Sequence, residues 1–159
     1  MPVRHPIRWK SLIVCLLIPL AVGALSGFLT MNSMEVYAGV NQPPLSPPGF
    51  LFPIVWTILF VLMGISSWLV WQSDEPSRTR ALSLYAVQLA VNFVWPLLFF
   101  NLQSYLFALL WLILLIVLVI AMIASFAKID KTAAWLQVPY LLWLLFAAYL
   151  NAGVWLLNR

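Results

Sequence analysis

Charge is what this sequence lacks most. Of its 159 residues, 8% are charged and 65% are hydrophobic. An average soluble domain is about a quarter charged and about half apolar, so this chain cannot supply the polar surface that a soluble fold needs. Its high hydrophobicity also excludes intrinsic disorder, which requires few apolar residues and a high net charge. The composition therefore predicts an integral membrane protein.

Residues that perform catalysis or hold metals are also scarce. The chain has one cysteine, Cys15, and one histidine, His5, which stands in the polar N-terminal segment. A single cysteine cannot form an internal disulfide, and no group of His, Cys and carboxylates has metal-ligand spacing. Glycine-rich phosphate loops and nucleophile–base pairs are missing as well. We therefore expect no metal and no cofactor, and these patterns assign no catalytic residue.

The positions of the few charges predict the membrane spans. Eight basic and four acidic residues leave four charge-free windows, 11–34, 36–73, 81–127 and 132–158. A spanning helix needs about 20 apolar residues, so the third window holds two helices, with a polar turn at 101–104. The prediction is an all-α integral membrane protein, a five-transmembrane-helix bundle forming one domain over 1–159. Its spans are expected at about 11–31, 50–71, 81–100, 105–126 and 132–155, with a structured, proline-rich loop at 32–49.

The basic residues also predict an orientation. With five spans, the N-terminal side carries all of the lysines and arginines except Arg159. The positive-inside rule then places the N-terminus inside and the C-terminus outside. The first apolar run is longer than the core of a signal peptide, so we interpret it as a retained span. Because the basic residues mark span ends and form no soluble basic face, we expect no nucleic-acid partner.

Two of the predicted spans carry stripes in which amides and aromatic rings share one helix face. The stripes are Gln88, Asn92, Trp95 and Phe99 on the third span, and Tyr140, Trp143, Ala147 and Asn151 on the fifth. An amide that faces lipid has unsatisfied polar atoms, so both stripes should point into the bundle. Two interpretations stay open with equal weight. The stripes either join helices by hydrogen bonds or form the wall of an apolar ligand pocket.

The nine tryptophans fall into three groups. Four lie near predicted span ends and are typical of membrane-interface belts; they are Trp9, Trp71, Trp135 and Trp155. Trp68 and Trp111 have no clear assignment. Trp56, Trp95 and Trp143 lie within spans and close to prolines. Flat indoles with an N–H donor suit a large planar ligand, and core packing explains them equally well.

Small residues indicate where helices approach closely. Gly23 and Gly27 form a GxxxG pair on the first span, and Ala86 and Ala90 form a similar pair on the third. Such pairs join helices either within one chain or across a dimer, and the sequence does not assign them. Four spans also carry a proline, which tends to kink a helix and so helps to open a cavity; these are Pro19, Pro53, Pro96 and Pro139.

Three segments resemble a known family. Residues 43–60, PPLSPPGFLFPIVWTILF, resemble the first loop and second helix of the tryptophan-rich sensory protein / translocator protein family, also called the peripheral-type benzodiazepine receptor. Residues 88–96, QLAVNFVWP, resemble its third helix, and residues 139–143, PYLLW, resemble the start of its fifth. The matching segments occur in the family's order, at family-like spacing, over nearly the whole chain.

The resemblance implies a pocket beneath the first loop of a five-helix bundle that is usually a homodimer in the lipid bilayer. Family members bind porphyrins such as protoporphyrin IX and related tetrapyrroles, hydrophobic drug-like ligands and, in some cases, sterols. With Asn151 added from the fifth-span stripe, the predicted ligand-binding residues are Gly23, Ser26, Trp56, Asn92, Trp95, Trp143, Ala147, Leu150 and Asn151.

The chain departs from the family pattern at a few positions. Phe50 stands where the family often has Trp, Gln42 where it often has Lys, and Ala152 where an aromatic is common. The sterol motif of animal members needs a tyrosine followed shortly by Lys or Arg. Here Tyr149 precedes Arg159 by ten residues, so the forward motif is absent.

The predicted function is that of a membrane receptor, sensor or carrier for porphyrins, acting in tetrapyrrole handling and stress response. The macrocycle would stack on Trp56 and Trp143, while Asn92 and Asn151 offer hydrogen bonds. One alternative is an enzyme that degrades porphyrin by photo-oxidation, in which Trp56 and Trp143 would be the catalytic residues. Another is a small-molecule transporter working as a dimer, although five helices do not form an even internal repeat.

Overall fold

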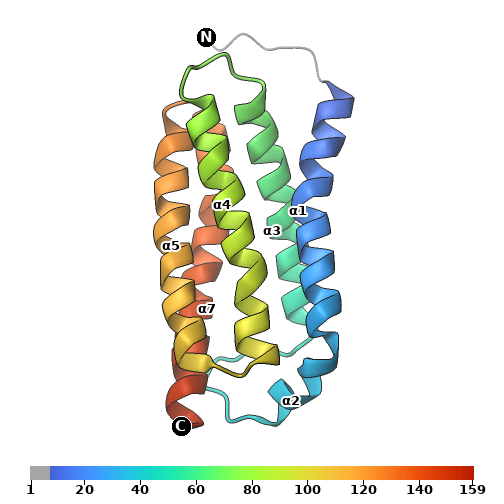
Figure 1. Cartoon of the computed structure of the whole chain (residues 1–159), viewed down its shortest axis with the longest axis vertical. Coiled ribbons are helices and arrows are strands. Elements are labelled where there is room, and N and C mark those ends of the chain that lie inside the picture. The colour runs from blue at the N-terminus through green and yellow to red at the C-terminus, as the bar shows by residue number, and fades with distance from the viewer. Residues whose placement is uncertain (1–7) are drawn as a thin grey trace.

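Five long helices make up most of the chain between residues 8 and 159. A computed structural model describes residues 8–159, and it has helices but no strand within that range. Five of the helical segments are long and apolar enough to cross a membrane, as Figure 1 shows. The predicted all-α, five-helix membrane bundle is thereby confirmed. Arg4, one of the basic residues that predict the orientation, and His5, the single histidine, lie outside the described residues.

The helices follow one another along the bundle with short connections. They are α1 (Trp9–Thr30), α2 (Met34–Gly39), α3 (Leu51–Trp71), α4 (Arg78–Pro96), α5 (Tyr105–Ala127), α6 (Lys131–Leu136) and α7 (Val138–Leu157). A 3₁₀ turn, η1 (Met31–Ser33), continues α1, and a π-helical segment, η2 (Leu97–Asn101), continues α4.

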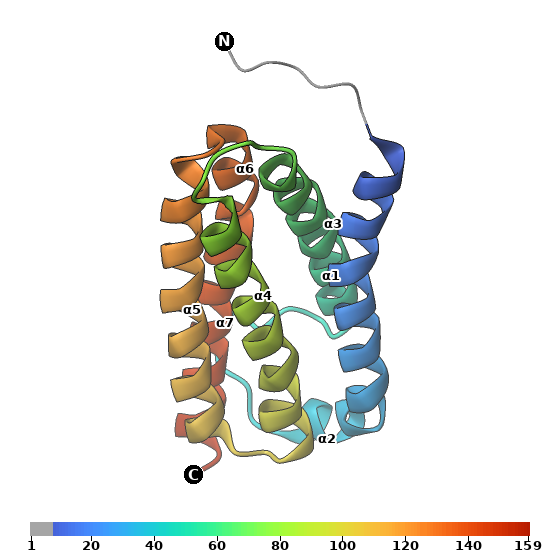
Figure 2. The same cartoon turned by 45° about the horizontal axis from the view of Figure 1, so that its top comes forward.

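The two ends of the bundle differ in what they carry. The connections α3–α4 and α5–α6 lie at the end where α1 begins, which we call the basic end (Figures 1 and 2). Helix α2, the loop 40–50 and the end of α7 lie at the opposite end, which we call the loop end. This arrangement is the one that the distribution of Lys and Arg predicts. Which end faces the inside of the membrane stays a prediction.

The expected loop at 32–49 begins later than predicted. The chain stays helical through η1 and α2 as far as Gly39, and the irregular part starts at Val40. No proline stands between Met31 and Pro43, so the backbone can stay helical until Gly39. The charge of Glu35 marked the end of an apolar window and not the end of the helix.

The fifth span is also two helices instead of one. Helix α6 ends at Leu136, and α7 begins at Val138 with Pro139 in its first turn. Proline has no N–H to donate and fits best at the start of a helix, which explains the break. Gln137 between them keeps helical backbone angles, φ −90° and ψ −10°, so the face of the helix continues across the joint.

Glycines set the close approach of α1 to α3. A Cβ on Gly64 would lie 2.9 Å from the carbonyl oxygen of Cys15 and 2.9 Å from Cα of Leu16. A Cβ on Gly23 would collide with the ring of Phe60, whereas Gly27 has open space around it. Gly23 therefore packs against α3 of its own chain, whereas no described residue packs on Gly27.

The second pair of small residues lies on the outer surface of the bundle. Ala86 and Ala90 on α4 are exposed. The predicted homodimer stays a prediction, with this face of α4 available to a second chain.

The two unassigned tryptophans connect helices. Trp68 Nε1 donates a 3.1 Å hydrogen bond to Ser11 Oγ, joining α3 to α1. Trp111 Nε1 donates a 2.8 Å bond to the carbonyl of Val91, joining α5 to α4. Their indole N–H groups are thus satisfied inside the bundle, which a buried indole requires.

Candidate ligand pocket

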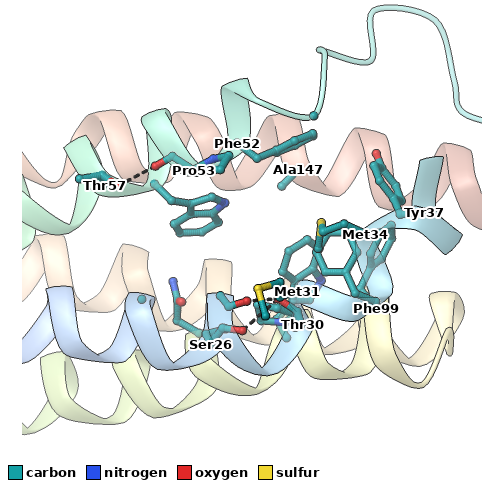
Figure 3. Close-up of a pocket in the computed structure, with 18 of the residues that line it drawn as sticks. Ser26, Thr30, Met31, Met34, Tyr37, Phe52, Pro53, Thr57, Phe99 and Ala147 are labelled. Carbon is teal, nitrogen blue, oxygen red and sulfur yellow. Dashed lines mark hydrogen bonds between the residues drawn. The ribbon is translucent and has the colours of Figure 1, made fainter.

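A cavity of about 800 Å³ lies in the half of the bundle nearer the loop end. Its walls come from α1, α3, α4 with η2, and α7, and α2 with the loop 40–50 closes its mouth. Figure 3 shows side chains from these elements pointing into a common space, among them Ser26 of α1, Phe52 of α3 and Ala147 of α7. Among residues 8–159, no acidic, basic or histidine side chain lines it.

The structure brings all of the predicted ligand-binding residues together around this cavity. Those lining it are Gly23, Ser26, Trp56, Asn92, Trp95, Trp143, Ala147, Leu150 and Asn151. They come from four helices that are far apart in the sequence. Their role in binding a ligand stays a prediction, because the cavity shows only that they share one space.

The two polar stripes fit both interpretations that the sequence left open, namely hydrogen bonds between helices and the wall of a pocket. Trp95 Nε1 on α4 donates a 3.1 Å hydrogen bond to Asn151 Oδ1 on α7. One turn away, Asn92 Nδ2 donates a 2.7 Å bond to the hydroxyl of Tyr140. Asn151 Nδ2 also donates, to the carbonyl of Tyr105 at 2.8 Å. The stripes therefore join helices by hydrogen bonds and also form part of the pocket wall.

Tyr140 is buried just beyond the pocket, behind Trp56 and Asn92 of its lining, on the side toward the basic end. Its ring meets that of Trp56 edge to face at 6.2 Å between centroids. Its hydroxyl accepts from Asn92 and donates to Gln88 Oε1, both at 2.7 Å. With both hydrogen bonds made inside the bundle, Tyr140 fixes the positions of Trp56 and Asn92 above it.

Tyr37 of α2 closes the pocket at the loop end. Its buried ring lies 6.3, 5.7 and 5.2 Å from those of Phe52, Phe99 and Phe100, measured between centroids. The carbonyl of Tyr37 accepts a 3.1 Å hydrogen bond from Gln42 Nε2. The aromatic cluster thus connects the short helix to α3 and η2, and Gln42 is held at the mouth.

The loop 40–50 is attached to the end of α7. Asn41 and Asn158 exchange two hydrogen bonds, from Asn41 N to Asn158 Oδ1 at 3.0 Å and from Asn158 Nδ2 to the Asn41 carbonyl at 2.7 Å. Tyr149 donates a 2.7 Å bond to the carbonyl of Pro44. Pro43 packs directly on Gly153, where a Cβ would collide with its ring. These contacts hold the loop over the pocket.

Some residues that line the pocket were not predicted from the sequence. Phe52 and Phe60 line the cavity beside Trp56, and the three follow i, i+4, i+8 on α3. That spacing was visible in the sequence, but Thr57 is the only polar residue in the first half of α3, so no polar face marked which stripe points inward. Met31 and Met34 also line the pocket, because the chain stays helical beyond Thr30. The sequence predicted a loop at 32–49, so this helical extension was not expected.

Comparison with known proteins identifies the family. Residues 15–156 match the model of the TspO/MBR family, a range that includes every residue of the pocket and of the loop above it. This chain belongs to the TspO/MBR family. The resemblance found in three segments of the sequence is confirmed for the chain as a whole.

Relatives within the TspO/MBR family span bacteria, archaea and animals. The chain is 38% identical over 149 residues to the tryptophan-rich protein TspO of Archaeoglobus fulgidus, covering 93% of this chain and 97% of the relative. It is 38% identical over 153 residues to the protein of the same name in Chlorobaculum tepidum, covering 93% and 96%. It is 35% identical over 146 residues to the translocator protein of Sus scrofa, covering 87% and 86%. These coverages indicate a shared architecture over the whole length.

Proposed function

We propose that this chain is a membrane receptor or carrier that binds porphyrins, such as protoporphyrin IX, in the pocket beneath its loop, as part of tetrapyrrole handling and stress response. The observation that supports the proposal is the cavity of about 800 Å³ with Trp56, Trp95 and Trp143 in its walls. Ligand sites typically measure about 300–1,000 Å³ and are mostly apolar, with a few polar groups that orient the ligand. A planar, hydrophobic macrocycle meets that description.

The aromatic walls are held in place before any ligand arrives. Trp56 stacks on Phe60 at 5.5 Å between centroids, with the planes 28° apart. On the other wall, Trp143 meets Phe52 edge to face at 6.0 Å. Fixed rings lose little conformational freedom on binding, so a macrocycle stacking against them has a low ordering cost.

The polar groups of the pocket predict how the ligand is oriented. Asn92 Nδ2 donates to Tyr140, which makes the amide oxygen of Asn92 the atom that faces a ligand as an acceptor. Trp143 Nε1 makes no hydrogen bond to any residue in the range 8–159. A macrocycle with pyrrole N–H donors can use the amide oxygen of Asn92, whereas Trp143 Nε1 is itself buried, so the indole of Trp143 offers its ring to the ligand.

Titration of protoporphyrin IX in lipid nanodiscs tests the proposal through tryptophan fluorescence. Trp56→Phe and Trp143→Phe should each weaken binding about two- to tenfold, the range expected for one aromatic contact, and reduce the quenched fraction. Trp135→Phe is the matched control, since Trp135 lies at the basic end, 72% exposed, outside the pocket lining. If all three variants bind and quench like the unaltered protein, porphyrin binds elsewhere and the proposal is wrong.

A further inference from the structure

A second group of polar side chains lies beneath the pocket, toward the basic end. Gln88 and Gln137 are both 0% exposed, and Tyr85 is 6% exposed. Within the described part of the chain, Nε2 of Gln88 and both amide atoms of Gln137 have no hydrogen-bond partner, whereas the hydroxyl of Tyr85 lies beside the side chain of Ser67 on α3. The proposed porphyrin site uses none of them, and none lines the pocket.

The backbone brings these atoms to one level of the bundle. Tyr85, Gln88 and Asn92 follow i, i+3, i+7 and so share a face of α4. Gln137 has helical backbone angles and precedes Tyr140 by three residues, so these two share a face as well. Tyr140 joins the two faces, because its hydroxyl bonds both Asn92 and Gln88 at 2.7 Å. The unpaired amide atoms of Gln88 and Gln137 thus lie within about one helical turn of Tyr140.

Without water, the unpaired polar atoms of this group would lower the free energy of unfolding by a large fraction of its total. A buried polar group without a partner costs about 1–3 kcal/mol, and total stability is only about 5–15 kcal/mol. The surrounding hydrocarbon offers no bulk water in exchange. A buried water molecule typically makes about three hydrogen bonds to groups of this kind. The amide N–H groups of Gln88 and Gln137 can donate to a water molecule, and the Gln137 oxygen can accept from it.

We infer that the bundle binds internal water between Gln88 and Gln137, beneath the pocket. The direction of the neighbouring bonds agrees with such a site. Asn92 donates to Tyr140 and Tyr140 donates to Gln88 Oε1, so Gln88 Nε2 ends the chain as a donor. A water molecule that accepts from Gln88 extends this chain without interruption from the pocket-lining amide of Asn92 into the lower half of the bundle.

Replacing Gln137 distinguishes a hydrated site from a dry one. Gln137→Met keeps the length of the side chain and removes both amide atoms. If water satisfies the amide, the variant loses part of the water site, and its Tm in detergent falls by roughly 2–4 °C. If the amide is dry, methionine removes an unpaired polar group and Tm rises. Gln103→Met is the matched control, because Gln103 is exposed between η2 and α5.

Hydroxyl-radical footprinting by an X-ray pulse gives a second readout on the unaltered protein. Radicals formed from bound water oxidise the side chains beside it, so Tyr85 and Tyr140 should be labelled although both are buried. Met122 is the internal control, because it is fully buried and readily oxidised but makes no part of the site. In Gln137→Met, labelling of the two tyrosines should fall severalfold. A rise of Tm in this variant, or tyrosine labelling no greater than that of Met122, overturns the inference.

Discussion

Trp95 on α4 donates a 3.1 Å hydrogen bond to Asn151 on α7, and both side chains line the same pocket. The contact shows that residues of the candidate site also hold the bundle together. A variant at either position changes helix packing and the pocket wall at once. Stability therefore has to be measured beside binding whenever these residues are replaced.

Trp95→Phe should lower stability less than Asn151→Leu does. The phenylalanine loses the indole donor but keeps a ring against Phe99, which lies 5.2 Å from that of Trp95 between centroids. The expected loss is about 0.6 kcal/mol, typical of one hydrogen bond between membrane helices. Asn151→Leu removes the partner of Trp95 and also the bond to the Tyr105 carbonyl, so its loss should be about twice as large. Thermal unfolding in detergent measures both, and equal losses would contradict the shared role of Asn151.

Gly64→Ala should destabilise the bundle much more than Gly27→Ala. The added methyl group on Gly64 meets backbone atoms of Cys15 and Leu16 at 2.9 Å, and a backbone cannot rotate away as a side chain can. Separating α1 from α3 should cost about 1–3 kcal/mol, as overpacking usually does. Gly27 has nothing within 4 Å, so alanine fits and adds helix propensity worth about 0.5–1 kcal/mol. Urea or thermal unfolding in micelles compares the two, and similar stabilities would show that α1 moves freely on α3.

Much of the architecture was readable from the distribution of charge. A charged side chain in the hydrocarbon core is costly, so four charge-free windows contain most of the five helices that are long and apolar enough to cross a membrane. The polar stripes on α4 and α7 were readable for the same reason, because amides among apolar residues reveal which face points inward. The pocket residues predicted from them, such as Asn92 and Trp143, do lie around one cavity.

Features that no polar or charged residue marks could not be predicted from the sequence. The α3 stripe that includes Phe52 and Phe60 lies in the first half of this helix, where Thr57 is the only polar residue. The role of Gly64 depends on which residue of α1 lies opposite, and only the fold supplies that information. The helical continuation to Gly39 crosses Glu35, where the charge argument ended the span. In each case the deciding contact lies between segments that local sequence does not relate.

Releasing the loop from α7 should speed ligand exchange. Asn158→Leu removes the two hydrogen bonds shared with Asn41, and Gly153→Ala pushes Pro43 off the helix. With each hydrogen bond worth about 1 kcal/mol, the Leu variant should release porphyrin about tenfold faster or more. Stopped-flow fluorescence gives the dissociation rate in nanodiscs. Gly39→Ala is the control, since nothing lies within 4 Å of an added Cβ there, and unchanged rates in both loop variants would mean that ligands leave by another path.

The absence of charge around the pocket should make it prefer esterified porphyrin over the free acid. Among the described residues 8–159, no cationic side chain lines the cavity, so a buried propionate would have no opposite charge. An unpaired carboxylate is costly to bury, and the dimethyl ester avoids this cost. The ester of protoporphyrin IX should therefore bind at least tenfold more tightly than the acid at neutral pH, as measured by tryptophan quenching. Gln42 stands at the mouth, so Gln42→Lys should tighten binding of the acid and leave the ester unchanged. Equal affinities for acid and ester in both proteins would show that the propionates project out of the pocket into water.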